Sequence, residues 1–296
     1  MQLNKHVMKL KTLQNLFFLF LCLSALPAAA QKNKGGLQLN KGQKLQMDNT
    51  INSVINMDLM GQSMEINSDA FMLYQAEVKD KKDTSYTIAS TLTKMTTSGT
   101  MMGQSYSFDS DNKKDRDSSD LGKMLKDQLD VPKEMELNSK GLVVNKKTTE
   151  EAPVTADANP MMGMMKGMAG NGTEFALTEV FQLIPSGTKQ GDSWSDSIIL
   201  DGVKTYRTYT LKEISSNIAT IAVSGKQTTA KMMEQMGSQI NMAMDAKITG
   251  ECKVDTKTGI VQQKNLVIEG SGAADAMGQS IPLTMKVTST LVVKNI

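Results

Sequence analysis

The side chains that most often carry catalysis or bind metals are scarce in this chain. It has one histidine, His6, and two cysteines, Cys22 and Cys252, among 296 residues. His6 and Cys22 lie in an N-terminal segment with the pattern of a secretory signal peptide. Without that segment the chain has no histidine to act as a base, and its single cysteine can form neither an intrachain disulfide nor a usual zinc site. We therefore predict no catalytic residue, no metal site and no cofactor.

Ser193 is the candidate nucleophile, in the sequence Gly191-Asp192-Ser193-Trp194. This motif lacks the glycine that follows the serine in the nucleophile turn of many hydrolases. No histidine is available as its base, so a serine–histidine–aspartate triad is excluded, and a serine–lysine pair is the alternative that stays open. A turn at Gly191-Asp192 followed by a core residue, Trp194, explains the same four residues.

Acidic residues occur in two patterns that invite a calcium or a glycosidase interpretation. Residues 109–117 resemble a calcium loop, but a lysine stands at the third ligand position and no glycine makes the turn, so we interpret them as a solvated loop. The pairs Glu134/Glu136 and Glu150/Glu151 lie on a solvent-facing alternation and in a linker. A glycosidase needs two carboxylates across an aromatic-lined cleft, and aromatic residues make up only 4% of the chain. These patterns favour a protein that is not an enzyme.

Methionine is the one residue type whose clustering suggests a specific ligand. Met161, Met162, Met164, Met165 and Met168 fall within one short tract, and thioethers are soft ligands that hold Cu(I). Methionine is frequent throughout, with 24 in the chain, so it also serves as a general apolar filler. We interpret the tract as an adaptable apolar segment and keep Cu(I) binding as an alternative.

The N-terminus predicts export. Three lysines among the first eleven residues precede an apolar run at 16–23, and the segment ends in Ala28-Ala29-Ala30, which is the pattern of a signal peptide. We predict cleavage after Ala30 and a periplasmic or secreted protein. A lipoprotein anchored at Cys22 is disfavoured because Cys22 lies inside the apolar run. No later stretch is long enough for a transmembrane helix. Losing three of the 33 basic residues leaves 30 against 31 acidic ones, so charge does not predict nucleic-acid binding.

The rest of the chain is dominated by alternation of apolar and polar residues, the pattern of strands with one buried face. The alternation is clearest from Ile240 to Val254 and places Cys252 on the apolar side. Residues 281–293 repeat it. Long one-sided strands joined by hairpins predict a mainly β protein with curved antiparallel sheets, as a half-barrel or a sandwich, and two or three short helices.

A Met-Gly turn recurs between these strands, and its glycine supplies the positive φ of a tight hairpin. Its copies are Met60-Gly61, Met102-Gly103, Met236-Gly237 and Met277-Gly278. The first two copies are 42 residues apart and the last two 41, which predicts two related β-rich halves. We expect the first half at residues 31–147, a flexible linker containing methionine, glycine and proline at 148–172, and the second half at 173–296.

Three segments carry a resemblance to a known family. Leu39–Gln43, Tyr106–Ser110 and Phe181–Trp194 resemble a family of exported bacterial β-rich proteins that is classed as a domain of unknown function. The resemblance implies no activity, cofactor or catalytic residue, because none is established for that family. Its expected shape is similar to the half-barrel carriers of lipids and lipoproteins in Gram-negative envelopes, which is an analogy of fold alone.

These observations predict a non-enzymatic binding module for an apolar or lipid-like ligand. With few aromatic residues and no histidine, apolar contact is the available source of binding energy. The candidate ligand-binding residues are Ile240, Met242, Met244, Ile248, Leu283 and Met285. The alternative is a structural or adhesion protein of the envelope, whose apolar faces are filled core. An enclosed cavity would favour binding, and a fully packed interior would favour the structural alternative.

Overall fold

The computed structural model describes residues 36–59, 61–101, 103–146, 172–200, 202–235, 238–276 and 279–296. All of them belong to one unit, Gly35–Ile296. The strands in this part of the chain are β1 (Lys44–Leu59), β2 (Gln62–Lys81), β3 (Ser85–Met101), β4 (Gln104–Asp109), β5 (Lys133–Asn138), β6 (Val143–Lys146), β7 (Ser193–Leu200), β8 (Val203–Ser215), β9 (Ile218–Gln235), β10 (Ser238–Asp255), β11 (Val261–Ala276) and β12 (Gln279–Asn295). Its helices are α2 (Lys113–Ser118), α3 (Asp120–Leu125) and α5 (Gly172–Glu179).

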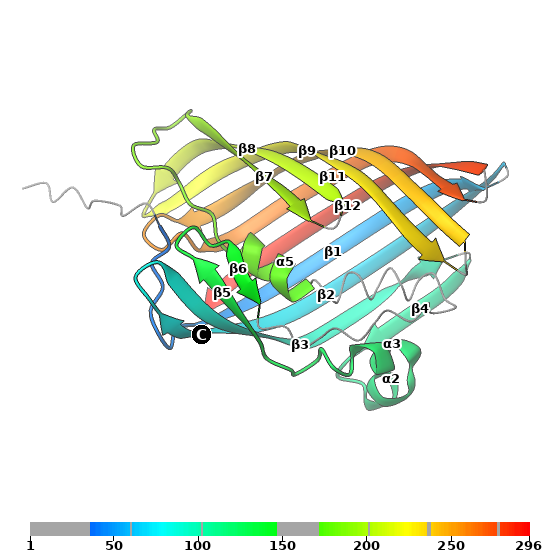
Figure 1. Ribbon diagram of the computed structural model, residues 1–296, viewed down its shortest axis with the longest axis horizontal. Helices are drawn as coiled ribbons and strands as arrows, with labels where there is room; N and C mark the ends of the chain where they lie inside the picture. Colours follow the sequence, from blue (N-terminus) through cyan, green and yellow to red (C-terminus); the bar gives the residue numbers. More distant parts are fainter. Residues whose placement is uncertain are drawn as a thin grey trace, which may run out of the picture. The chain divides into compact units, whose positions relative to one another are not determined.

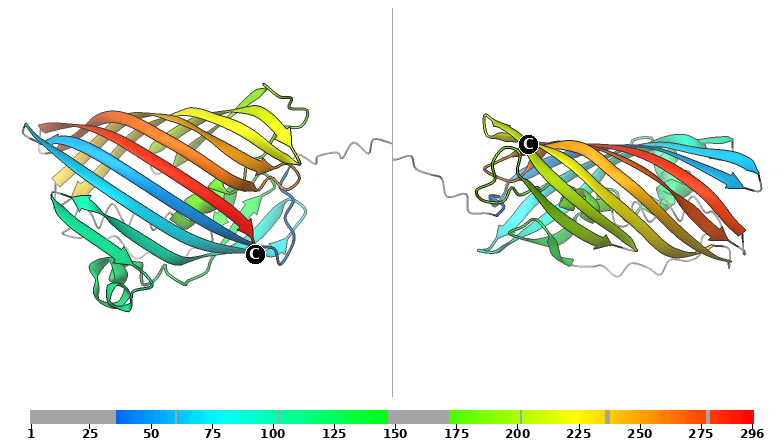
Figure 2. Two further views of the ribbon diagram at one scale, coloured as in Figure 1. Left: turned by 180° about the vertical axis from the view of Figure 1, so that it is seen from behind. Right: turned by 90° about the horizontal axis from the view of Figure 1, so that it is seen from above.

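The strands form one 12-stranded antiparallel sheet in the order β6-β5-β3-β2-β1-β12-β11-β10-β9-β8-β7, with β4 also paired to β3 (Figure 1). Most neighbours are consecutive in the chain, but β1 pairs with β12, so that Ser53 lies opposite Val287. The sheet is continuous and curves around α5 (Figure 2). The predicted mainly β fold is confirmed, and of its two possible forms the open half-barrel is the one observed. The division into two halves stays a prediction, because residues 148–171 of the predicted linker lie outside the described residues.

Two of the Met-Gly turns fall within the described residues at their glycines. Gly61 has a φ of 80° and Gly103 a φ of 74°, as the hairpin interpretation requires. Gly61 joins β1 to β2, and its amide donates to the side chain of Asp58 at 2.9 Å. The copies at 236–237 and 277–278 lie outside the described residues.

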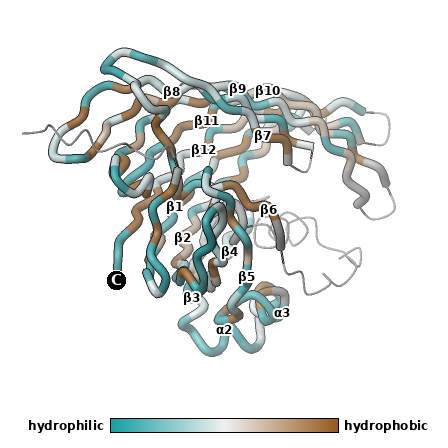
Figure 3. The backbone as a smooth tube through the Cα atoms, turned by 60° about the vertical axis from the view of Figure 1, so that its left-hand side comes forward, coloured by the Kyte–Doolittle hydropathy of each residue, from teal (hydrophilic) through white to brown (hydrophobic). Residues whose placement is uncertain are grey.

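One face of the sheet is apolar and the other polar, as the alternation predicts. Along β10 the inward side chains from Met244 to Val254 are buried, whereas Lys247 and Thr249 between them are exposed. Figure 3 shows hydrophobic and hydrophilic residues alternating along the strands. Cys252 lies on the buried face, which confirms its predicted position.

The inward face carries two clusters of buried hydrophobic side chains. The larger cluster joins β1–β3 and β12 to the helices, and includes Tyr74 from β2 and Leu177 from α5. The smaller cluster, over β8–β11, includes Tyr209 and Cys252, and Trp194 packs against it. Trp194 is thus a core-facing residue, as predicted, and its ring stacks on that of Tyr209 with the centroids 5.7 Å apart.

The acidic stretch 109–117 is more ordered than the solvated loop we predicted. It ends in α2, which begins after Asn112, whose side chain accepts from the Lys114 amide at 3.0 Å. The carboxylate of Asp115 accepts from the Asp109 amide at 3.1 Å, so it is used to fix the turn. Short polar side chains bond neighbouring amides in this way at helix starts, and composition alone does not separate that use from solvation.

Two boundaries in the second half are set by strand pairing. Strand β7 begins at Ser193, where Trp194 pairs with Tyr209. Helix α5 ends at Glu179. The chain leaves the helix there because the carbonyl of Val180 accepts from the Val261 amide at 2.8 Å, so this segment pairs with β11.

Inward-facing glycines lie where the backbones of β10 and β11 approach closely. A Cβ atom added to Gly250 would lie 2.1 Å from the carbonyl oxygen of Asn265 in β11. One added to Gly272 would lie 2.1 Å from the carbonyl oxygen of Ala243 in β10. Only glycine fits where neighbouring backbones approach so closely, and glycine kinks are a usual source of sheet curvature.

Candidate functional site

The predicted ligand-binding residues lie on the inward face of β10 and β12, one on each side of β11. The strand register aligns Met244 with Gly272 and Leu283, and in the next row Gly270 lies opposite Met285. Because β11 contributes glycines here, the side chains of β10 and β12 are the ones that stand above the backbone. The fold therefore brings the Met and Leu side chains of two separate strands onto one surface.

Strands β1 and β2 extend this surface. Leu283 pairs with Met57, which pairs with Met64, and Met285 pairs with Ile55 in the next row. We call the resulting surface the apolar strip, and its residues are Ile55, Met57, Met64, Ile66, Met244, Ile248, Ile268, Leu283, Met285 and Val287. The predicted residues Ile240 and Met242 continue the same face of β10 beyond the strip.

The apolar strip lies beyond the two core clusters, which include none of its residues. Met244, Ile248 and Leu283 are buried, with exposed fractions of 9%, 2% and 8%. The remaining strip residues are half-buried, as are Ile240 and Met242. The opposite face of the same strands is polar and carries the exposed ion pair Lys286–Glu269. The role of the predicted residues in ligand binding stays a prediction.

A group of charges, three of them buried, lies on the same inward face, between α5 and the sheet. The Glu179 carboxylate at the end of α5 accepts from Arg207 Nη1 of β8 at 2.8 and 3.1 Å, and from Lys264 Nζ of β11 at 2.8 Å. Arg207 Nε also donates to Asp196 of β7 at 3.3 Å, and Asp196 accepts from the Tyr209 hydroxyl at 2.9 Å. We call Glu179, Arg207, Lys264 and Asp196 the charge cluster.

Burial makes these charges dependent on one another. The side chains of Lys264, Arg207 and Glu179 are only 4%, 8% and 10% exposed. Burial alone would raise the pKa of Glu179, but the charges of Lys264 and Arg207 outweigh it and hold that pKa well below its usual range. Burial would lower the pKa of Arg207, but the negative charge of Glu179 outweighs this effect and raises that pKa. Both groups are therefore ionised, and the cluster ties α5 to two strands that are not neighbours.

Sequence reasoning missed the charge cluster, although part of its signal is visible. Arg207 lies between Thr205 and Tyr209 on the inward alternation of β8, and Lys264 precedes Leu266 on that of β11. A cation on the apolar side of a strand indicates a buried partner. The alternation gives the side of the sheet but not the helix residue that supplies the partner.

The other residues considered as a nucleophile or as metal ligands lie in positions that suggest no catalytic or metal-binding role. Ser193 Oγ is exposed and shares a hydrogen bond of 2.8 Å with Thr210 Oγ1. Burial raises the pKa of Cys252 to about 11, which leaves its thiol protonated and unreactive at neutral pH. In the part of the chain that the structure describes, no three His, Cys, Asp or Glu residues are grouped to hold a metal ion. The methionine tract at 161–168 and Glu150/Glu151 lie outside the described residues.

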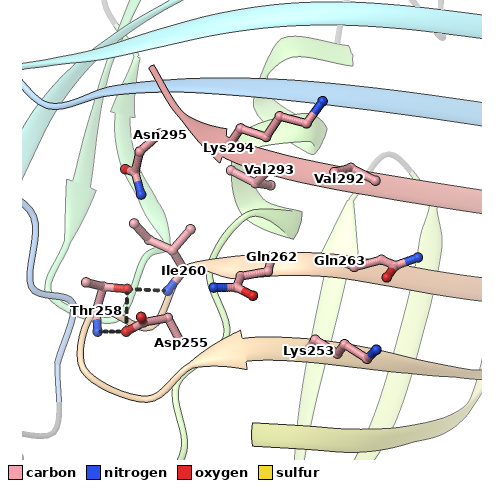
Figure 4. Close-up of a pocket in the computed structure, with 10 residues that line it drawn as sticks. All are labelled: Lys253, Asp255, Thr258, Ile260, Gln262, Gln263, Val292, Val293, Lys294 and Asn295. Carbon is pink, nitrogen blue, oxygen red and sulfur yellow. Dashed lines mark hydrogen bonds between the residues drawn. The ribbon is translucent and has the colours of Figure 1, made fainter. Parts of the chain in front are cut away.

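A hollow of about 550 Å³ lies away from the strip, at the ends of β10, β11 and β12 (Figure 4). Its lining residues are Lys253, Asp255, Thr258, Ile260, Gln262, Gln263, Val292, Val293, Lys294 and Asn295. The carboxylate of Asp255 accepts from the Thr258 amide and hydroxyl at 2.9 and 3.1 Å, so it stabilises the turn before β11. Lys294 is likewise paired with Asp48 at 3.0 Å. The lining is mostly polar, so this hollow suits an apolar ligand less well than the apolar strip does.

No helix among the described residues has the length and apolar character needed to cross a membrane.

Residues 83–261 match the model of a family of unknown function, DUF6263. The match covers more than half of the chain, so the protein belongs to this family, which confirms the resemblance to a domain of unknown function. No curated protein matches the sequence.

Solved structures with a similar arrangement include lipovitellin, described with its lipid–protein interactions, at 11% identity and a TM-score of 0.49; the match covers 87% of this chain and 25% of that one. The COG4313 outer membrane channel from Pseudomonas putida F1 matches at 7% identity and a TM-score of 0.23, covering 88% of this chain and 98% of the channel. The outer membrane protein OpdK from Pseudomonas aeruginosa matches at 6% identity and a TM-score of 0.21, covering 88% and 100%. This chain thus spans about a quarter of the length of lipovitellin.

Proposed function

We propose that this protein is a non-enzymatic binding module whose apolar strip holds an apolar or lipid-like ligand, and that it acts in the cell envelope after export. The observation that carries the proposal is the position of the strip. Seven of its ten side chains are half-buried and all lie outside the two core clusters, although they are as apolar as the residues within them. Partly exposed apolar surface on the inside of a curved sheet is where an apolar ligand finds contact.

The composition of the strip suits a ligand of variable shape. Met57, Met64, Met244 and Met285 contribute flexible, polarizable side chains that repack around different partners. Covering about 200 Å² of apolar ligand surface at about 25 cal/mol per Å² would contribute roughly 5 kcal/mol before the costs of ordering. That corresponds to weak to moderate affinity, which suits a carrier that must also release its ligand.

The test is saturable binding of a fluorescent lipid probe to protein purified without detergent and extracted with organic solvent. Met57→Asp and Met244→Asp place a charge on the strip and should each weaken binding at least tenfold, because the carboxylate must be desolvated or displace the probe. Thr249→Asp is the matched control, since Thr249 is exposed on the outward face of β10. Thermal unfolding of each variant verifies that it is folded.

The half-buried position of Met57 keeps the test informative if Met244→Asp does not fold. Equal effects of the inward and outward substitutions, or no saturable binding at all, would favour the alternative of a structural or adhesion protein with a filled core. Export is tested separately by the intact mass of the protein from its native source, which should begin at Gln31. A diacylglycerol adduct on Cys22 would instead identify a lipoprotein.

A further inference from the structure

We propose that the ligand of the apolar strip is an amphiphile with one apolar chain and a terminal carboxylate, and that Arg207 and Lys264 bind this carboxylate in the place that Glu179 occupies. The inference rests on the proposed function, because it names the head group of a ligand for the same strip. It follows from where the two cations lie, which element supplies their partner, and what can replace that partner.

Both cations border the apolar strip on the inward face of the sheet. Along β11 this face runs from Gly270 through Ile268 and Leu266 to Lys264. The six steps along the strand from Gly270 to Lys264 span about 20 Å at about 3.3 Å per residue, which is comparable to an extended long acyl chain. The register places Arg207 of β8 opposite Gly225 of β9, which lies opposite the strip residue Ile248 of β10. A chain lying along β11 over the strip would therefore bring its head group to the two cations.

The two cations belong to the sheet, whereas their shared carboxylate comes from α5. Arg207 and Lys264 converge on one carboxylate with three hydrogen bonds between 2.8 and 3.1 Å. A guanidinium and an ammonium that meet around one carboxylate form a complete binding set for that group. The Glu179 side chain is thus bound as a free carboxylate ligand would be bound.

Exchange of one carboxylate for another keeps the buried charges balanced. If the head group of an amphiphile takes the place of Glu179, Arg207 and Lys264 retain the same charge partner and the same kind of hydrogen bonds. A neutral head group gives no such compensation, because it would leave the buried Lys264 without a charge partner and Arg207 with Asp196 alone, which is strongly unfavourable. The cluster therefore selects a carboxylate over an alcohol or an ester on the same chain.

The experiment removes the internal carboxylate and supplies an external one. Glu179→Ala leaves Arg207 and Lys264 without their shared partner and should lower the temperature of thermal unfolding. Decanoate at millimolar concentration should restore much of that loss and should bind this variant at least tenfold more tightly than decanol, because only decanoate supplies the missing charge. The matched control is Glu179→Ala with Lys264→Met, in which the preference for decanoate over decanol should fall sharply.

The outcomes separate this inference from the proposed function. Equal binding of decanoate and decanol by Glu179→Ala overturns the head-group assignment but leaves an apolar binding module in place. Failure of both probes to bind Glu179→Ala and the unsubstituted protein overturns the proposed function and this inference together.

A measurement on the unsubstituted protein covers the case in which Glu179→Ala does not fold. Decanoate carrying ¹³C at its carboxyl carbon is titrated by NMR while bound. A head group held by Arg207 and Lys264 should remain ionised well below the pKa of free decanoic acid, because both cations stabilise its charge. A bound carboxyl that titrates at or above its free value lies elsewhere, and overturns the inference.

Discussion

Acid unfolding offers a direct check on the charge cluster, because Glu179 is the buried acid on which two cations depend. Burial raises the pKa of Glu179, whereas the charges of Lys264 and Arg207 lower it. The net effect moves this pKa from 4.5 to about 2 in the folded protein. A group whose pKa is lowered by folding stabilises the folded state above its unfolded pKa. This stability is lost as the pH falls toward the folded pKa. The window for Glu179 therefore runs from about pH 4.5 to about pH 2.

The size of the loss follows from the same two values. At about 1.4 kcal/mol per pH unit between them, Glu179 should contribute about 3 kcal/mol at neutral pH that is absent near pH 2. The assay is urea unfolding at pH 7, 4.5, 3.5 and 2.5 at constant ionic strength, followed by the fluorescence of Trp194, the single tryptophan of the chain. Because Trp194 stacks on Tyr209 next to the cluster, its emission reports unfolding of this region.

A double variant isolates the contribution of Glu179. Glu179→Gln with Lys264→Met removes one charge of each sign and leaves Arg207 paired with Asp196, so it should lose about 2 kcal/mol less than the wild type between pH 4.5 and pH 2.5. The exposed pair Lys286–Glu269 serves as the control, and Glu269→Gln with Lys286→Met should reproduce the wild-type pH dependence. If the Glu179 double variant loses as much stability as the wild type over that interval, the buried carboxylate is not the group whose protonation weakens the fold, and our reasoning is refuted.

Two further predictions concern the inward face of the sheet. Burial raises the pKa of Cys252 to about 11, so at pH 8 a thiol reagent should modify it only as fast as the protein opens, and rapid stoichiometric labelling of the native protein would contradict its burial. Gly250→Val should lower the free energy of unfolding by about 2 kcal/mol or more, because its Cβ would meet the Asn265 carbonyl oxygen at 2.1 Å. Urea unfolding measures this change, the outward substitution Thr249→Val is its control, and equal stability of the two variants would show that the backbones can separate at no cost.

The sequence predicts the local elements of this fold well, because they depend on neighbouring residues. The period-2 alternation from Ile240 to Val254 identifies the buried face of β10, and the glycines of the Met-Gly turns identify the ends of hairpins. The start of α3 also depends on nearby residues, since Ser119 Oγ accepts from the Gly122 amide at 2.9 Å. Each of these features needs only a few residues of context.

The features that the sequence does not predict depend on distant residues. Nothing in the local pattern of β1 indicates that it pairs with β12, because any strand with one buried face can pair with another strand of this kind. The inward positions of Arg207 and Lys264 follow from the alternation, but their joint partner Glu179 lies on helix α5, outside both strands. The apolar strip was predicted in part: β10 and β12 were identified, whereas Met57 and Met64 joined it only through the register.

The pairing of β1 with β12 has a consequence for the order in which the protein folds. Every other long strand can find its neighbour through a nearby hairpin, but Leu45 lies opposite Asn295, almost a whole chain length away. Contacts between residues so distant in sequence close large loops, which is entropically unfavourable and kinetically slow. We expect the hairpins on each side of this seam to form first and the seam to close last. Until β12 has been synthesised and has reached β1, two long strand edges stay exposed, and that is the interval in which the chain is most prone to aggregate.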